Sequence, residues 1–295
     1  MTLSKSDLIA GVMVTVLWGC NFSVIEMGLR NLDPYILTLL RFTLCSVPLI
    51  FFIRRPSGVS LKTLFVYGVL FGAGLWWTVN FAMASGLSPG MSSVFLQFSA
   101  FFTIILSAIF LKEKLHSLHV CGMTFALVGL VMMLIVSGQQ STVIGILLVL
   151  AAALAWSLCN LIVKIKRPGE MVAFIVWSSL FSVPAIFVLT IMVKGWEPFY
   201  SLSSGLVGEA IFSIVFQSYV TTIVGYWVWN NLMKKYPVSS VAPLSLLVPV
   251  SGVAASHIFF GESMSFLQGT AVALVLMGIV IFLNAHNFKL QTRPD

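Results

Sequence analysis

Charged residues are scarce in this chain. They make up 8% of the 295 residues, and nine of them are acidic, whereas soluble domains carry about 25% charged residues. The mean hydropathy is correspondingly high, at +1.04. No polar stretch between the apolar segments is long enough to form a soluble catalytic domain. The composition therefore excludes a soluble globular fold and predicts one integral membrane domain.

Groups that catalyse reactions or bind metals are also few. The four cysteines, Cys20, Cys45, Cys121 and Cys159, all lie in apolar segments, and their spacing matches no zinc or redox motif. We interpret them as small packing residues. The sequence contains no HExxH motif and no cluster of His, Asp and Glu. We therefore expect no catalytic residue, no metal and no cofactor, and we do not expect an enzyme.

What the chain does contain is a series of ten apolar segments of roughly 20 residues, each long enough to cross a hydrocarbon core of ~30 Å as a helix. Short polar breaks separate them. They are residues 8–28, 34–53, 62–86, 90–111, 118–136, 143–163, 171–193, 207–232, 238–260 and 266–284. The sequence therefore predicts an all-α integral membrane protein with ten transmembrane helices.

The basic residues are distributed unequally between the two sides that these segments define. The terminal tails and the even-numbered gaps hold 13 of the 16 basic residues, the odd-numbered gaps hold Arg30 and Lys194, and Arg41 lies inside a segment. Under the positive-inside rule, both termini are cytoplasmic. A net charge of +7 would suggest nucleic-acid binding in a soluble protein, but here it lies mostly in inner loops that meet lipid headgroups. We expect the lipid bilayer and a small molecule as partners, and no nucleic acid.

The two halves of the chain repeat. Ser92-Ser93-Val94 opens the fourth segment and Ser239-Ser240-Val241 opens the ninth. Glu113 and Glu262 follow these two segments at helix junctions, where we expect each to cap the helix that follows it or to interact with the dipole of that helix. Because five helices is an odd number, the second half begins on the opposite side of the membrane. We predict a five-helix repeat in residues 1–137 and a second, inverted repeat in residues 138–295. Inverted repeats with a site between them are typical of secondary transporters.

Several motifs resemble a known family. Leu40-Arg41-Phe42 and the glutamates after the fourth and ninth segments resemble the drug/metabolite transporter (DMT) superfamily. The stretches that resemble its EamA family are Trp18-Gly19-Cys20-Asn21-Phe22, Phe101-Phe102-Thr103-Ile104, Thr222-Ile223-Val224-Gly225-Tyr226 and the segment from Val241 to Val250. The resemblance covers almost the whole chain. It implies a five-plus-five inverted repeat in the bacterial inner (cytoplasmic) membrane, and export of small amino acids or similar metabolites, of the cysteine or O-acetylserine type, by alternating access.

Polar and aromatic side chains recur at helical spacing in six of the segments. Polar groups in a bilayer need a partner or a wet cavity, so we predict a central cavity lined by amides, hydroxyls and aromatic rings that suits a small zwitterion. The candidate substrate-binding residues are Trp18, Asn21, Trp77, Asn80, Phe81, Gln97, Phe101, Trp156, Asn160, Tyr219, Thr222, Tyr226 and Trp229. The competing interpretation is that these residues form interhelical hydrogen bonds and interfacial aromatic belts.

Two further features bear on the prediction. Arg41 is the ionisable residue that lies deepest in a segment, so it should reach the interface or find a carbonyl or carboxylate; a structural role is favoured over substrate contact.

The segments at 118–136 and 266–284 are nearly devoid of polar groups and carry small residues such as Gly122 and Ala126. Such faces suit close helix contacts or the seam of a homodimer.

The predicted function is therefore a secondary transporter. Within transporters, a carrier of drugs or nucleotide sugars is the alternative, although phosphates would call for several basic residues in the cavity, and Arg41 is the one that the segments provide. A membrane protein that transports nothing would leave the polar cavity unexplained. An intramembrane enzyme would need a catalytic constellation that the sequence does not offer.

Overall fold

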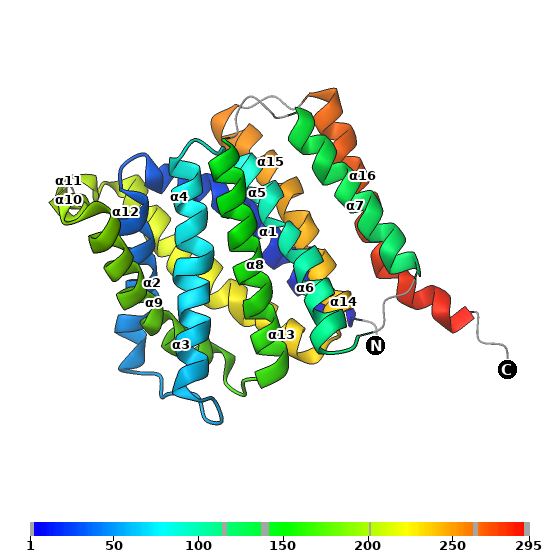
Figure 1. The fold of residues 1–295 in the computed structure, drawn as a ribbon, viewed down its shortest axis with the longest axis horizontal. Helices are drawn as coiled ribbons and strands as arrows, with labels where there is room; N and C mark the ends of the chain where they lie inside the picture. Colours follow the sequence, from blue (N-terminus) through cyan, green and yellow to red (C-terminus); the bar gives the residue numbers. More distant parts are fainter. Residues whose placement is uncertain (1–2, 114–116, 137–141, 201, 262–264, 292–295) are drawn as a thin grey trace.

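The computed structural model describes residues 3–113, 117–136, 142–200, 202–261 and 265–291, and every regular element in these ranges is a helix (Figure 1). Glu262, for which a capping role is expected, lies outside the described residues. The helices of the first half are α1 (Lys5–Leu29), α2 (Pro34–Ile50), α3 (Leu61–Val69), η1 (Leu70–Trp77), α4 (Thr78–Ala84), α5 (Pro89–Leu96), α6 (Phe98–Phe110) and α7 (Ser117–Val136). Those of the second half are α8 (Val143–Lys166), α9 (Met171–Lys194), α10 (Glu197–Tyr200), α11 (Leu202–Gly205), α12 (Gly208–Val215), η2 (Phe216–Gly225), α13 (Tyr226–Lys235), α14 (Val238–Val241), η3 (Ala242–Leu246), α15 (Leu247–Phe260) and α16 (Phe266–Gln291).

Seven helices in the described ranges are long and apolar enough to cross a membrane: Lys5–Leu29, Leu61–Ala84, Pro89–Phe110, Val143–Lys166, Met171–Lys194, Gly208–Lys235 and Val238–Phe259. Three apolar helices in these ranges are shorter: Pro34–Ile50, Ser117–Met132 and Gly269–Gly278. The expectation of an all-helical, multi-pass membrane protein is confirmed. The number of ten spans, their inversion and the side on which the termini lie stay predictions.

Short polar side chains begin several of these helices. The hydroxyls of Ser4, Ser60, Ser88 and Thr142 each accept a hydrogen bond from a backbone N–H in the first turn of α1, α3, α5 and α8. The carboxylate of Asp33 does the same for α2, where it accepts from the backbone N–H of Tyr35 at 2.8 Å. These caps satisfy N–H groups that a helix cannot satisfy itself. Side chains that precede α1, α2, α3, α5 and α8 therefore stabilise the first turns of these helices.

The third segment of each half contains a π-helical stretch. η1 lies between α3 and α4, and η2 lies between α12 and α13. The hydroxyl of Thr78 donates to the carbonyl of Ala73 at 2.9 Å, and that of Thr222 donates to the carbonyl of Gln217 at 2.7 Å. Both bonds reach back five residues, so the same side-chain contact accompanies the wide turn in both halves. π-Helical turns inside α-helices are frequent at functional sites.

Helices of one half pack against helices of the other. α7 lies along α16 at one edge of the bundle, and α2 lies along α9 toward the opposite edge (Figure 1). Gly278 lies against the backbone of Gly122 and Ala126, where a Cβ would come within 2.6 Å of Gly122 O. The small-residue face of α7 is thus used for a close contact within the chain. A homodimer seam at this face stays an untested alternative.

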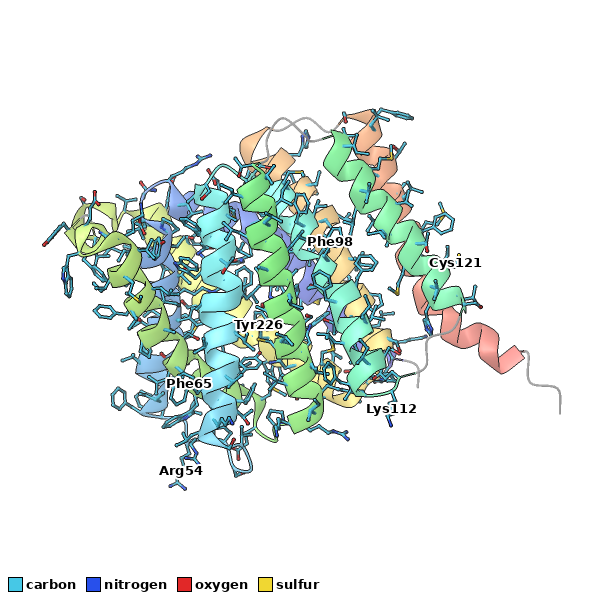
Figure 2. The ribbon with its side chains drawn as sticks, in the orientation of Figure 1. Arg54, Phe65, Phe98, Lys112, Cys121 and Tyr226 are labelled. Carbon is cyan, nitrogen blue, oxygen red and sulfur yellow. The ribbon has the colours of Figure 1, made fainter. Side chains whose placement is uncertain are left out.

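One end of the bundle is held by polar contacts between the halves. Asp7 forms an ion pair with Lys235 at 2.7 Å and accepts a hydrogen bond from the hydroxyl of Tyr236 at 2.6 Å. Glu113 accepts from the backbone N–H groups of Val238 (3.2 Å) and Ser239 (3.4 Å) at the start of α14. Figure 2 shows Arg54 and Lys112 at this same end. Lys112 has a positive φ of 55°, and the turn there leads the chain to Glu113. Glu113 therefore caps a helix of the other half, α14, although the sequence suggested the helix that follows it.

Candidate functional site

Four aromatic rings from three helices meet in the interior of the bundle. They are Trp18 of α1, Trp156 of α8, and Tyr226 and Trp229 of α13, and we call them the aromatic cluster. The ring centroid of Trp18 lies 5.4 Å from that of Trp156, 4.7 Å from that of Tyr226 and 5.3 Å from that of Trp229. All four side chains are buried, and Figure 2 shows Tyr226 midway between the ends of the bundle. Such tilted and edge-on pairs are favourable ring geometries.

Glycine allows this close packing. A Cβ at Gly225 would lie 2.7 Å from Nε1 of Trp18, so a side chain there would displace the indole. The indole N–H of Trp18 donates to the carbonyl of Thr221 in η2 at 3.1 Å. The wide turn of η2 thus holds one ring of the aromatic cluster by its backbone.

Asn160 links the aromatic cluster to a neighbouring helix. Its side-chain oxygen accepts from the indole N–H of Trp229 at 3.0 Å, and its side-chain nitrogen donates to the hydroxyl of Thr103 in α6 at 3.2 Å. Both atoms of this buried amide are therefore used. On another side, the indole N–H of Trp76 in η1 donates to the hydroxyl of Tyr226 at 3.1 Å.

Arg41 of α2 is fully buried beside the aromatic cluster. Its Nε donates to the hydroxyl of Thr222 at 2.9 Å, and its Nη1 donates to the side-chain oxygen of Gln217 at 3.2 Å. The guanidinium carbon lies 4.0 Å from the ring centroid of Trp76. The arginine therefore finds a side-chain carbonyl, as one of the expected alternatives had it, together with a hydroxyl and an aromatic face.

Several buried polar atoms of Arg41 and of the predicted site residues have no hydrogen-bond partner. They are both amide atoms of Asn21, Nη2 of Arg41, Nε1 of Trp156, Oδ1 of Asn80 and Oε1 of Gln97. Buried polar groups are nearly always paired, because leaving one unpaired costs about 1–3 kcal/mol. A concentration of unpaired groups is what a site for a polar ligand provides.

The predicted residues do not all come together. Four of them form the aromatic cluster: Trp18, Trp156, Tyr226 and Trp229. Asn160 hydrogen-bonds Trp229 of this cluster, and Thr222 hydrogen-bonds Arg41. Trp77 and Phe81 instead stack on each other at 5.4 Å and pack edge-on against Tyr35, and Asn80 donates to Thr38 at 2.8 Å. These three belong to a second polar–aromatic group, between α2 and the η1–α4 segment.

Three more predicted residues lie elsewhere. Phe101 packs in a separate hydrophobic core cluster with residues of α7, α16 and η3. Gln97 lies at the break between α5 and α6 and donates to the carbonyl of Ser93 at 3.1 Å. Tyr219 is half-buried and is not among the rings that contact the aromatic cluster. The wide turn of η2 explains this, because a 3.6-residue period no longer places Tyr219 on the face of Thr222 and Tyr226.

The structure also adds residues that helical spacing did not single out. Gln217 hydrogen-bonds Arg41, Trp76 hydrogen-bonds Tyr226, and Thr103 hydrogen-bonds Asn160. We call the aromatic cluster, together with Arg41, Asn160, Thr222 and these three residues, the central group. In the sequence, Gln217 and Trp76 could have been recognised as site residues because each places a polar or indole group in an otherwise apolar segment. Among the residues that the structure describes, no group of three or more His, Cys, Asp and Glu side chains is placed to hold a metal ion.

Comparison with known proteins agrees with this architecture. The profile of the EamA-like transporter family matches residues 5–135 and 143–284. The chain is 35% identical over 290 residues to a protein of Escherichia coli (strain K12) named "Probable amino-acid metabolite efflux pump", with 95% of both chains covered. It is 32% identical over 296 residues to a protein of the same name from Salmonella typhimurium, with 98% of both chains covered.

More distant relatives extend the comparison. A "Probable terminal-alkyne amino-acid exporter" of Streptantibioticus cattleyicolor is 24% identical, covering 95% of this chain and 94% of its own. A solved crystal structure matches with a TM-score of 0.71 at 20% identity, covering 95% of this chain and 98% of that chain. At that identity the likeness shows the fold alone.

Proposed function

The chain belongs to the EamA-like transporter family, and on that premise we propose that it exports small amino acids or amino-acid-like metabolites, of the cysteine or O-acetylserine type, across the bacterial inner membrane. The two relatives that are 32–35% identical are both named as amino-acid metabolite efflux pumps. The proposed mechanism is alternating access, with the site between two inverted five-helix repeats, residues 1–137 and 138–295.

The observation that carries the proposal is the central group of rings and unpaired polar atoms. It is assembled from both halves, with Trp18, Arg41 and Trp76 from the first and Trp156, Asn160 and Tyr226 from the second. The unpaired amide of Asn21 can bind either end of a zwitterion, since its oxygen accepts from ammonium and its nitrogen donates to carboxylate. Aromatic faces cover the apolar part of such a molecule and attract its ammonium group.

The same group disfavours a nucleotide-sugar carrier. Phosphates are recognised by several lysines or arginines, whereas Arg41 is the one basic residue among the residues of the central group. A carrier of drugs without charge requirements would not need a buried arginine, whose burial is costly.

The test is counterflow in proteoliposomes. Purified protein is reconstituted with unlabelled amino acid inside, and uptake of the same radiolabelled amino acid is followed over a panel of the common amino acids and O-acetyl-L-serine. Accumulation above protein-free liposomes is expected for small members of the panel. If the protein is monodisperse before reconstitution and no member of the panel shows counterflow, the proposal is wrong.

A further inference from the structure

We propose that Arg41 is the residue that binds the carboxylate of the substrate, so that a free carboxylate is what the site requires of its cargo. The inference rests on the proposed function, because it assigns one group of the substrate to one residue of the same site. It also assigns substrate contact to a residue for which the sequence favoured a structural role.

The hydrogen bonds of Arg41 leave part of its guanidinium unused. The side chain is fully buried, its Nε donates to Thr222, and its Nη1 donates to Gln217. Nη2 has no hydrogen-bond partner. Both partners are neutral, and no carboxylate contacts the guanidinium among the residues that the structure describes. A buried cation without an anion is costly, and a bound carboxylate removes that cost.

The guanidinium is also held in one orientation. The two hydrogen bonds hold the guanidinium at Nε and at Nη1, and the ring of Trp76 lies 4.0 Å from the guanidinium carbon. Arginine presents its donors in a rigid planar fork that matches a carboxylate. With its orientation already fixed, little side-chain entropy remains to be lost when the carboxylate binds.

The rest of a zwitterion finds complementary groups nearby. Trp76 connects Arg41 to the aromatic cluster through its hydrogen bond to Tyr226. The rings of the aromatic cluster offer faces for the ammonium group. Asn21 lies on α1 between two points that contact the α12–η2 segment, Trp18 at Thr221 and Val24 at Ser213, and both of its amide atoms are unpaired. An α-amino acid therefore meets a cation for its carboxylate and neutral or π groups for its amine.

The most informative variant is Gln217→Glu, because it places a carboxylate where the side-chain oxygen now accepts from Arg41 at 3.2 Å. The hydroxyl of Ser213 now accepts from the Gln217 side chain at 2.8 Å and donates to the carbonyl of Val24 at 2.6 Å, so it can donate to the new carboxylate by giving up its bond to Val24. The internal carboxylate neutralises Arg41 and competes with that of the substrate. If Arg41 were structural, the variant would gain an ion pair and keep its transport.

The experiment measures counterflow of radiolabelled L-cysteine, kept reduced, or of O-acetyl-L-serine where cysteine is not carried. Unlabelled L-cysteine, L-cysteine methyl ester or cysteamine is added outside the liposomes, together with the labelled substrate, as a competitor. For the wild type we expect the ester and the amine to compete at least ~10-fold more weakly than the free amino acid, since a site built around a polar group rejects analogues that lack it. Gln217→Glu and Arg41→Gln should lose counterflow by ~10-fold or more, and Gln217→Glu should melt in detergent at or above the wild-type temperature.

Thr43→Val serves as the matched control on α2, because the Thr43 hydroxyl bonds its own helix, at Leu39 O, and we expect full counterflow from it. Wild-type counterflow with equal competition by cysteamine, or full counterflow by Gln217→Glu, overturns the inference and leaves the proposed function standing. If the wild type carries neither L-cysteine nor O-acetyl-L-serine, the cysteine-type function is wrong and the inference falls with it.

Discussion

Single amide side chains in the interior differ in whether their atoms are paired. Asn160 uses both atoms, accepting from Trp229 and donating to Thr103. Asn21 is equally buried, on the opposite half, but neither of its amide atoms has a partner. The contrast separates an amide that holds the structure from one that is available to a ligand.

This contrast predicts different outcomes for the same substitution. Asn21→Leu should leave the melting temperature in detergent unchanged or higher, because it removes an unpaired buried group, and should lower counterflow by ~10-fold or more. Asn160→Leu should be destabilised by about 1–3 kcal/mol, because the indole N–H of Trp229 loses its acceptor. Tryptophan fluorescence melts and counterflow rates measure both effects. A strongly destabilised Asn21→Leu would show that its amide is structural.

At the scale of elements, helix starts and wide turns decide what the side chains can reach. Glu113 and Val238 lie in different halves, yet the glutamate satisfies the first N–H groups of α14. η2 changes the helical period, so that Gln217, Thr222 and Tyr226 face inward while Tyr219 turns partly away. Both features depend on backbone geometry that the order of residues does not reveal directly.

The cap on α14 predicts a specific stability change. Glu113→Ala should lower the free energy of unfolding by about 1 kcal/mol, because two backbone N–H groups lose their acceptor. Glu113→Gln should keep part of the stability and most of the counterflow, since its amide oxygen still accepts from one of the two N–H groups, whereas its nitrogen cannot accept from the other. Glu170 precedes α9 without a side-chain cap bond, so Glu170→Ala is the matched control and should melt like the wild type. Equal melting of Glu113→Ala and Glu170→Ala would contradict the cap.

The geometry of η2 predicts which cysteines a substrate protects. In a background with the four native cysteines replaced, Tyr226→Cys should be labelled several-fold more slowly by a small water-soluble thiol reagent when O-acetyl-L-serine is present. Tyr219→Cys should be labelled at the same rate with and without it, because Tyr219 does not contact the aromatic cluster. Equal protection of both positions would mean that the segment presents a regular helical face to the substrate.

At the scale of the whole molecule, the pattern of apolar segments predicted the helices and most of the central residues. Trp18, Trp156, Tyr226 and Trp229 were recognised because aromatic and polar groups recurring in apolar segments indicate an inward face. The separation of Trp77, Phe81 and Phe101 from them could not be predicted, because it depends on how neighbouring helices are rotated about their axes. The partners of Arg41 could not be predicted either, since Gln217 reaches it only through the wide turn of η2.

The arrangement of charge predicts the orientation of the whole chain in the membrane. Asp7 in the first turn of α1 is paired with Lys235 at the end of α13, and Arg54 and Lys112 lie at the same end of the bundle (Figure 2). A cytoplasmic location of this end follows from the positive-inside rule. Green fluorescent protein fused after Asp295 should therefore fluoresce, and alkaline phosphatase fused there should be inactive. Phosphatase fused after Gly195, at the opposite end of α9, should be active. The reverse pattern at both positions would mean that the transporter has the opposite orientation in the membrane. The positive-inside rule would then not account for the distribution of its basic residues.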